Sequence, residues 1–581
     1  MNPVKAPPPQ PAEAAPPASE IPPSAPAKAP KYATAESMAK AQRSISVSEF
    51  FAKNRHLLGF DNPRKALLTT VKEAVDNSLD ACEEAGIAPV VEIEIAQLSE
   101  THFKVIVTDN GPGIVRRQIP NVFGQLLYGS KFHRLRMSRG QQGIGISAAG
   151  MYGLLTTGRP VRITSSTRGR GKAHFYELQI DTRSNRPDII TDTEIGWDRP
   201  HGTRVEIELE AKYQRGRQSV DDYLEQTAIA NPHVTLVYKA PDGREARYEP
   251  GVKVLPPLPR EIRPHPYGVE LGVLIKMLQD TRAKSVRQFL TSEFSRVSPR
   301  VAKEILATAG IRDNARVRSM GGDDAKAIYH AVQKTKILAP ATDCVVPIGE
   351  EQLIAGLRQV VPAEFFTATT RRPAVYRGNP FLIEAAVAYG RPEGETPPAP
   401  AAGTNDGDED DSDDVHAAHA KAVEQEQQEQ GQLARLIRFA NRVPLLYQQG
   451  ACAITKAVTA TNWKSYGLTQ SRGALPSGPL TIVVHMASVW VPFTSESKEA
   501  VASYPEVLKE LRLALQECGR KLGQHIRKTV RVRQELKKRS YIEKYIPAIG
   551  EALRDILDLK DRQVDKLCAD LKTVLERTRK L

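Results

Sequence analysis

One helix with two different faces constrains the fold of this chain more than any other segment. The run KALLTTVKEAVDNSLDACEEAG predicts a helix whose buried stripe consists of residues three and four positions apart: Leu68, Val71, Val75, Leu79 and Cys82. Glu73, Asn77 and Asp80 share another face. Since side chains at i and i+4 are neighbours, the Glu73 carboxylate can hold a water beside a cation bound by the Asn77 amide oxygen. The alternative is a solvated polar face.

The segments that follow this helix alternate between strand and turn patterns. The runs VVEIEIA and FKVIVTD alternate apolar and polar residues, and after a glycine-rich stretch further strands end in TRVEIELE. These patterns predict a largely antiparallel sheet covered by helices, and therefore an α+β fold.

The second candidate motif is KVIVTDNGPGI, a strand that runs into a turn. Asp109 ends the strand, and Gly111 and Gly113 allow the backbone to approach a ligand closely. An ordinary Asp-Asn-Gly hairpin turn is the alternative. The next segment, GIVRRQIPNVFGQLLYGSKF, has a helical pattern and no immediately pairing strand, which favours a ligand-binding turn.

The third motif is the glycine-rich loop from Gly140 to Gly145, which leads into a helix whose free amide groups can bind phosphates. The chain contains no GxxxxGK[ST] motif, and the segment before the loop lacks the strand of a dinucleotide fingerprint. Ser130, Lys131 and Arg139 lie beside the loop and would contact phosphate oxygens. A basic surface loop is the alternative for Lys131 and Arg139.

These motifs, followed by His201-Gly-Thr203, occur in the order of the sequence boxes of GHKL ATPases, and the chain resembles that class. The resemblance implies a Bergerat α/β sandwich that binds ATP and Mg²⁺. Glu73 would be the general base and Asn77 the Mg²⁺ ligand. The implied nucleotide-binding residues are Asn77, Asp80, Asp109 as the adenine-amino acceptor, Gly111, Gly113, Ser130, Lys131, Arg139, the lid residues Gly140, Gln141, Gln142, Gly143, Ile144, Gly145 and Ile146, and Thr203.

Composition divides the rest of the chain. Residues 1–43 are rich in Pro and Ala, and residues 390–432 are acidic; both compositions are typical of disordered segments. The predicted folded parts are an ATPase domain at 44–255, a small helical insert at 256–312 and a second α/β region at 313–535 that contains the acidic insertion. Residues 536–581 are predicted to form a helical tail.

Within the GHKL class, the chain resembles the B subunits of type IIB topoisomerases (topoisomerase VI). SVSEFFAKNRHLLGFDNPRKALLTTVKEAVDNSLDA resembles the leading segment of that family, and RQFLTSEFSRVSPRVAKEILATAGI resembles its helix-two-turns-helix insert. TTRRPAVYRGNPFLIEAAVAYG and FANRVPLLYQQG resemble strands of its transducer domain. NWKSYGL resembles the loop with the lysine that senses the nucleotide, which makes Lys464 a catalytic and nucleotide-binding candidate.

The net charge and the spacing of the cysteines limit which binding partners and which cellular compartment are expected. The 581-residue chain has a formal net charge of +13, which favours a polyanionic partner. Its five cysteines lie far apart, so neither a zinc site nor a disulfide framework is predicted. The N-terminal segment lacks an apolar core, and PLTIVVHMASVWV is too short to span a bilayer. We expect no membrane association and an intracellular location, in the cytoplasm at the nucleoid or in a eukaryotic nucleus.

The resemblance implies an ATP-dependent DNA topoisomerase subunit that leaves DNA cleavage to an A subunit. Two copies would dimerise on binding ATP, capture double-stranded DNA and work within an A2B2 heterotetramer. The terminal helices, with HIRKTVRVRQELKKRS, would dock the A subunit or contact DNA phosphates. The alternatives are another GHKL clamp, of the mismatch-repair or chaperone type, and a DNA-binding scaffold without turnover.

Overall fold

The computed structural model covers most of the chain. The described residues are 35–42, 44–131, 134–140, 143–167, 171–390, 432–495, 497–557 and 559–578. The chain divides into two compact units, Met1–Ile45 and Ser46–Leu581. The first contains α1 (Ala35–Ala41), which corrects the prediction that residues 1–43 have no regular structure, because AESMAKA consists largely of strong helix formers. Residues 1–34 and the acidic stretch 391–431 lie outside the described residues.

An eight-stranded sheet with the order β5-β4-β3-β6-β2-β1-β7-β8 forms the first sheet domain. All neighbours are antiparallel except β1 and β7, so the predicted sheet is confirmed. Its strands are β1 (Val90–Gln97), β2 (His102–Asp109), β3 (Val161–Ser166), β4 (Lys172–Asp181), β5 (Arg186–Gly196), β6 (Gly202–Glu210), β7 (Thr235–Lys239) and β8 (Glu245–Tyr248).

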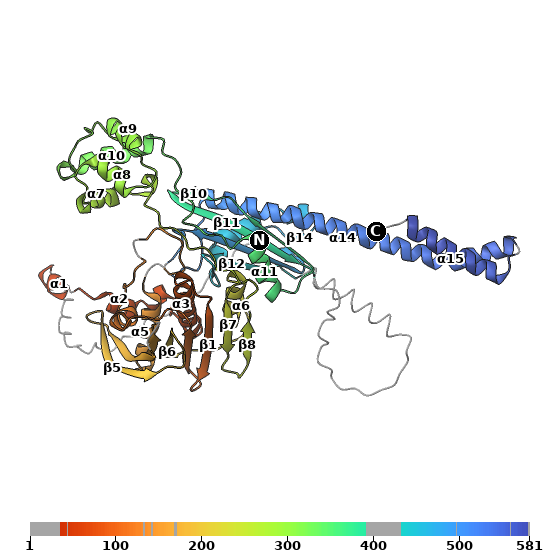
Figure 1. The fold of residues 1–581 in the computed structure, drawn as a ribbon, viewed down its shortest axis with the longest axis horizontal. Coiled ribbons are helices and arrows are strands. Elements are labelled where there is room, and N and C mark those ends of the chain that lie inside the picture. The colour runs from red at the N-terminus through yellow and green to blue at the C-terminus, as the bar shows by residue number, and fades with distance from the viewer. Residues whose placement is uncertain are drawn as a thin grey trace, which may run out of the picture. The chain divides into compact units, whose positions relative to one another are not determined.

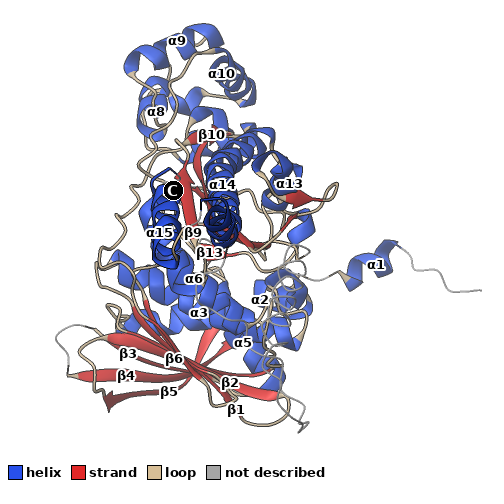
Figure 2. Cartoon of the chain, turned by 90° about the vertical axis from the view of Figure 1, so that its right-hand side faces the viewer, coloured by secondary structure: helices blue, strands red, loops and turns tan. Residues whose placement is uncertain are grey.

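Helices cover one face of this sheet, as Figure 2 shows for α3, α5 and α6. The helices of the domain are α2 (Val47–Lys53), η1 (Arg55–Leu58), α3 (Pro63–Glu84), η2 (Arg116–Gln118), α4 (Ile119–Gly124), α5 (Gly145–Thr157) and α6 (Val220–Ala230). The Asn62 side chain caps α3 by accepting a hydrogen bond from Lys65 N at 2.9 Å. The predicted apolar stripe of α3 is buried against the sheet, so its polar face is left for a ligand.

A helical insert with its own hydrophobic core follows. It consists of η3 (Pro266–Gly268), α7 (Leu271–Asp280), α8 (Val286–Glu293), α9 (Pro299–Ala309), η4 (Val317–Ser319) and α10 (Gly322–Lys334). The core continues to Ile337, so the predicted end at residue 312 is too early. The polar run after Ile311 concealed α10, whose Ile328 and Val332 pack into this core.

The second sheet domain is built on the order β10-β11-β16-β12-β13, with β9 also paired to β11 (Figure 1). Its elements are α11 (Glu350–Val360), β9 (Phe365–Thr370), β10 (Ala374–Tyr376), β11 (Asn379–Tyr389), β12 (Arg435–Ala440), β13 (Val443–Pro444), η5 (Gln449–Ala451), α13 (Ala453–Ala460), η6 (Trp463–Tyr466), the small pair β14 (Thr469–Gln470) and β15 (Pro476–Ser477), and β16 (Leu480–Ser488). Ile229 and Ala230 of α6 pack into the apolar cluster on one face of this sheet, which joins the two sheet domains.

One long helix, α14 (Pro505–Leu557), crosses the predicted boundary at residue 535 without interruption, so no separate tail begins there. Its first part, from Val507 to Leu522, packs against the second sheet, and its far end pairs with α15 (Asp561–Thr578) (Figure 1). Among the described residues, no helix combines the length and apolar character that a membrane crossing needs.

The packing of α11 on α6 gives a test of how the two sheet domains join. A Cβ atom on Gly356 would lie 2.3 Å from the backbone oxygen of Ile229, so we expect Gly356→Ala to cost about 1–3 kcal/mol through overpacking. The measurement is thermal unfolding followed by circular dichroism. Gly322→Ala is the matched control, because that exposed helical glycine has open space around it. Equal melting temperatures for the two variants would contradict the tight packing.

Candidate functional site

A cavity of about 610 Å³ lies where α3, the glycine-rich loop and the second sheet domain meet. Its volume is in the range of about 300–1,000 Å³ that small-molecule sites occupy. The predicted general base Glu73 lines it together with most of the predicted nucleotide-binding residues: Asn77, Asp109, Gly113, Ser130, Lys131, Gly140, Gly143, Ile144, Gly145, Ile146 and Thr203. Gln141 and Gln142 lie outside the described residues. The polar face of α3 therefore forms one wall of a ligand-sized cavity.

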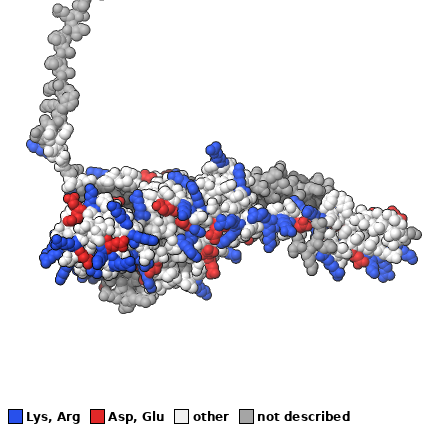
Figure 3. Space-filling view, turned by 90° about the horizontal axis from the view of Figure 1, so that it is seen from above, with Lys and Arg blue, Asp and Glu red and all other residues white. Residues whose placement is uncertain are grey.

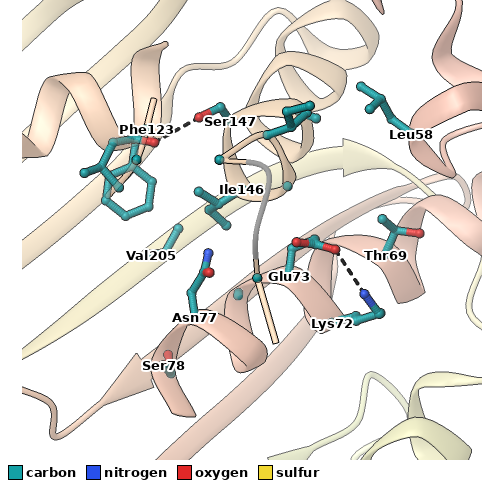
Figure 4. Close-up of a pocket in the computed structure, with 18 of the residues that line it drawn as sticks. Leu58, Thr69, Lys72, Glu73, Asn77, Ser78, Phe123, Ile146, Ser147 and Val205 are labelled. Atoms are coloured by element: carbon teal, nitrogen blue, oxygen red, sulfur yellow. Dashed lines mark hydrogen bonds and ion pairs between the residues drawn. The ribbon is translucent and has the colours of Figure 1, made fainter. Parts of the chain in front are cut away.

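Glu73 and Asn77 project from one face of α3 into the cavity (Figure 4). Lys72 Nζ lies 3.1 Å from Glu73 Oε1 and 3.6 Å from Asp76 Oδ2. Burial acts to raise the pKa of Glu73, but the positive charges of Lys72 and Lys498 outweigh it and hold the pKa below its ordinary value. Glu73 is therefore a carboxylate, the form that a general base requires.

Asp76 is the second carboxylate beside Lys72. Burial is the largest influence on it and raises its pKa to about 6, although the charge of Lys72 opposes that rise. Tyr223 OH, from α6, donates a hydrogen bond to Asp76 Oδ1 at 3.0 Å. Lys72 thus lies between the cavity carboxylate Glu73 and a buried carboxylate that α6 holds in place.

The glycine-rich loop approaches α3 so closely that a side chain would not fit. A Cβ atom on Gly145 would lie 1.7 Å from Glu73 Oε2. Gly145 is the first residue of α5, and its N-cap, Ile144, makes no side-chain cap hydrogen bond. The first amide groups of α5 are thus next to Glu73, where they can bind an anion.

Asp109, at the end of β2, is held in place by three hydrogen bonds. Its Oδ2 accepts a hydrogen bond from Ser78 Oγ at 2.9 Å, and its Oδ1 accepts from Gly111 N at 2.8 Å and Thr203 N at 3.1 Å. Burial raises the pKa of Asp109, although these three donors oppose the rise. The carboxyl group is therefore fixed in orientation. Gly111 supports it from outside the cavity lining.

Arg139 and Asp80 correct the sequence-based assignment, because both lie outside the cavity lining. The buried Arg139 guanidinium donates to Asp80 Oδ1 at 2.8 Å, to both oxygens of Glu83 at 2.7 and 2.8 Å, and to Asn231 Oδ1 at 2.6 Å. Lys131 does line the cavity, but its Nζ lies 2.6 Å from Asp80 Oδ2. A buried guanidinium requires such partners, so Arg139 ties the loop to α3 and α6 in this structure.

The position of Lys464 also differs from the prediction that it contributes to the nucleotide site. It is exposed on η6, outside the cavity lining, and its neighbour Tyr466 packs against Gly519 of α14, where an added Cβ would lie 2.4 Å from the Tyr466 ring. Trp463 is fully buried and donates from Nε1 to Val458 O at 2.9 Å. The aromatic residues that flank Lys464 therefore hold a turn against α14.

The lysine that the second sheet domain contributes to the cavity is Lys498. Burial lowers its pKa, and the attraction of Glu73 partly opposes that change. The sequence reasoning missed Lys498 because SESKEA is a polar loop without periodicity. The only local feature of the sequence that could have pointed to Lys498 is its position after the apolar strand β16.

The comparisons with known proteins agree with this division of the chain. The family described as "Histidine kinase-, DNA gyrase B-, and HSP90-like ATPase" matches residues 62–213, and the family "Topoisomerase VI B subunit, transducer" matches residues 340–538. The first match contains Glu73, Asn77 and Asp109, and the second contains Lys498. The cavity is thus formed by both matched regions.

Three curated relatives are described as the B subunit of a type 2 DNA topoisomerase 6. The protein of Archaeoglobus fulgidus is 44% identical over 92% of this chain and 82% of its own length. The protein of Methanococcoides burtonii is 46% identical over 90% of this chain and 79% of its own length. That of Pyrococcus horikoshii is 36% identical over 90% of this chain and 93% of its own length. Because the similarity extends over most of both proteins, the chain belongs to the family of type 2 DNA topoisomerase 6 B subunits.

Proposed function

We propose that this chain is the ATP-binding and ATP-hydrolysing B subunit of a type IIB DNA topoisomerase. It times the passage of one DNA duplex through a transient double-strand break made by an A subunit, which relaxes supercoils and decatenates DNA. The observation that carries this proposal is the cavity itself, where Glu73 of the ATPase region faces Lys498 of the transducer region. Such a site can link ATP hydrolysis to movement between the two regions.

The fixed carboxyl group of Asp109 supports adenine recognition. Both of its oxygens accept hydrogen bonds from the protein, and carboxylate oxygens have further lone pairs that can accept one from the exocyclic amino group of adenine. Thr203 lies beside it in the cavity and is anchored by Ser165, whose Oγ is 3.0 Å from Thr203 Oγ1. We assign this end of the cavity to the base of ATP.

The start of α5 and the Asn77 side chain support phosphate and Mg²⁺ binding. Gly143 to Ile146 place the start of α5 on the cavity, where amide groups would bind the phosphates. The Asn77 side-chain oxygen faces Gly140, at 3.8 Å from where a Cβ on that glycine would be. One neutral oxygen fits Mg²⁺, which takes few protein ligands when phosphates and waters complete its shell. When bound, the ion would neutralise phosphate charge.

Glu73 supplies the base for hydrolysis in this proposal. Its carboxylate would accept a proton from the attacking water, while Lys72 holds one of its oxygens. Lys498 would pair with the terminal phosphate of ATP and lose that partner once the phosphate leaves. The second sheet domain would then be released from the nucleotide.

The charge distribution on α14 supports DNA binding. Its segment between Glu517 and Glu535 contains no acidic residue and carries these cations: Arg520, Lys521, Arg527, Lys528, Arg531 and Arg533. Figure 3 shows many Lys and Arg side chains on the visible face of the molecule, with Asp and Glu side chains among them. A basic helix of this kind binds the phosphates of duplex DNA without reading sequence.

The assembly we propose is an A2B2 heterotetramer in which the two copies of this chain dimerise on binding ATP. The far end of α14 exposes large apolar side chains that suit docking to the A subunit: Tyr541, Tyr545, Ile549, Ile556 and Leu557. Since its proposed substrate is chromosomal DNA, we expect the chain to work inside the cell, at the nucleoid or in a eukaryotic nucleus.

Glu73→Gln tests the catalytic proposal, because the amide keeps the shape of the side chain but cannot accept the proton. We expect kcat for ATP hydrolysis to fall by about 10²- to 10⁴-fold with ATP binding retained, and relaxation of supercoiled DNA with an A subunit to stop. Glu84→Gln is the control, since Glu84 lies on the same helix but outside the cavity. Hydrolysis by Glu73→Gln at the wild-type rate would sink the proposal.

Asn77→Ala tests the ion and the nucleotide-driven dimer. With Mg²⁺ and a non-hydrolysable ATP analogue, we expect the wild-type chain to sediment as a dimer and Asn77→Ala to remain a monomer, because the phosphates lose their ion. Asn314→Ala, in an exposed turn of the helical insert, should behave like the wild type. If the sedimentation of the wild-type chain does not change when the nucleotide is added, the proposed ATP-driven dimerisation is refuted.

The pH dependence of hydrolysis tests the role of Lys72. The positive charge of Lys72 lowers the pKa of Glu73, so Lys72→Met should raise that pKa. Glu73 would then stay protonated to a higher pH, and the acid limb of the kcat profile should move to higher pH. Lys104→Met, which removes a charge paired with Glu206 and Glu208 on the sheet, should leave the limb in place. An unmoved limb in Lys72→Met would disprove this assignment.

A further inference from the structure

The loop that carries Lys498 is held at its base by the second sheet domain. Phe493 and Val501 form an isolated antiparallel bridge, and Thr494 N donates to Ala500 O at 2.9 Å. Ala453 N, at the start of α13, donates to Val501 O at 2.8 Å. Lys498 itself has a φ of 54°, in the left-handed region that a residue with a side chain rarely adopts. Its backbone is therefore held in an unfavourable conformation by its surroundings.

The tip of the same loop is held from the other side, by the ATPase region. Glu499 Oε1 lies 2.6 Å from Lys65 Nζ, and Asp61 Oδ1 lies 3.0 Å from the same nitrogen. The Lys65 and Glu499 side chains are only 13% and 8% exposed, so solvent screens this pair weakly. Lys65 Nζ also lies 5.3 Å from the ring centre of Tyr447. Lys65 thus bonds the loop to the first turn of α3.

This contact stands in a fixed relation to the catalytic group. Lys65 and Glu73 are on the same helix, about 12 Å apart along its axis at 1.5 Å per residue. Lys498 and Glu499 are consecutive residues, so the side chain that reaches into the cavity and the one that pairs with Lys65 leave the loop side by side. Both Lys65 and Glu499 line the cavity together with Lys498. A backbone movement that separates Glu499 from Lys65 would also displace Lys498, because the two residues are consecutive.

We infer that the Lys65–Glu499 ion pair is a latch between the ATPase and transducer regions that positions Lys498 in the nucleotide cavity. The inference rests on the proposed ATP hydrolysis and adds two positioning residues to it. Lys65 and Glu499 act through Lys498 and take no part in proton transfer. Closing the latch places Lys498 against the nucleotide, and opening it frees the transducer region while ATP stays bound.

A charge exchange tests the latch on the full chain in complex with an A subunit and DNA. We expect Glu499→Lys to lower kcat for ATP hydrolysis by about 10- to 100-fold, since misplacing a group by about 1 Å has effects of that size. KM for ATP should change less than kcat, because Asp109 and the amide groups at the start of α5 stay in place. The double variant Lys65→Glu with Glu499→Lys should recover most of the lost kcat, which a merely structural role of either residue would not produce.

Two controls sharpen this experiment. Arg435 and Glu225 form another ion pair between the two sheet domains, at 2.7 Å, but outside the cavity lining, so Glu225→Lys should leave kcat unchanged. Glu499→Gln removes the charge and keeps the side-chain size, so it should lower kcat even if the lysine variant folds poorly. Circular dichroism would show that each variant is folded.

The outcomes separate the latch from the function on which it rests. If Glu73→Gln hydrolyses ATP like the wild type, the proposed function is wrong. If Glu73→Gln is inactive but Glu499→Lys and Glu499→Gln keep the wild-type kcat, the function stands and the latch is overturned. A folded charge-exchange variant that is no more active than Glu499→Lys would also overturn it.

Discussion

The buried guanidinium of Arg139 organises the structure around the cavity. It joins the base of the glycine-rich loop to Asp80 and Glu83 of α3 and to Asn231 at the end of α6. Glu83 also pairs with His233 at 2.8 Å. A buried cation left without one of these partners would be strongly destabilising, so loop, α3 and α6 keep one mutual arrangement. The face of α3 that lines the cavity is thus oriented by charges that lie outside the cavity lining.

The same polar layer continues into the second sheet domain. Asn231 Nδ2 donates to Arg442 O at 3.4 Å, and Arg442 N donates to Nε2 of His485 at 3.1 Å. His485 Nδ1 lies 2.8 Å from Glu384 Oε2, and both side chains are fully buried between β11 and β16. Buried polar groups of this kind demand complete pairing and so favour a single packing. The two sheet domains are joined both by this layer and by the loop of Lys498.

The features that were predicted from the sequence are those that a local pattern of residues encodes. The apolar stripe of α3, the alternating strands and the ordered glycine motifs led to the fold, and Glu73, Asn77 and Asp109 lie in one cavity as expected. Charged residues were harder to assign, because Arg139 and Lys131 look alike in sequence. Both pair with carboxylates of α3, and only the fold decides that Lys131 lines the cavity. Lys498 was missed and Lys464 chosen because the reach of a loop across a domain boundary leaves no periodic signal.

The continuity of α14 gives the molecule a lever arm. Its last fully buried apolar side chain against the second sheet is Leu522. Ile546, whose backbone oxygen lies 3.7 Å from Cys568 Sγ of α15, is about 36 Å farther along at 1.5 Å per residue. The displacement of a rigid helix end is the tilt angle multiplied by the helix length. A tilt of α14 by about 10° at the second sheet would therefore displace the far end of this span by roughly 6 Å. Pro547 lies just beyond that span, inside the helix, where it removes one backbone hydrogen bond. A small rotation of α14 at the second sheet would thus displace the far end of the helix by a distance comparable to the pitch of an α-helix.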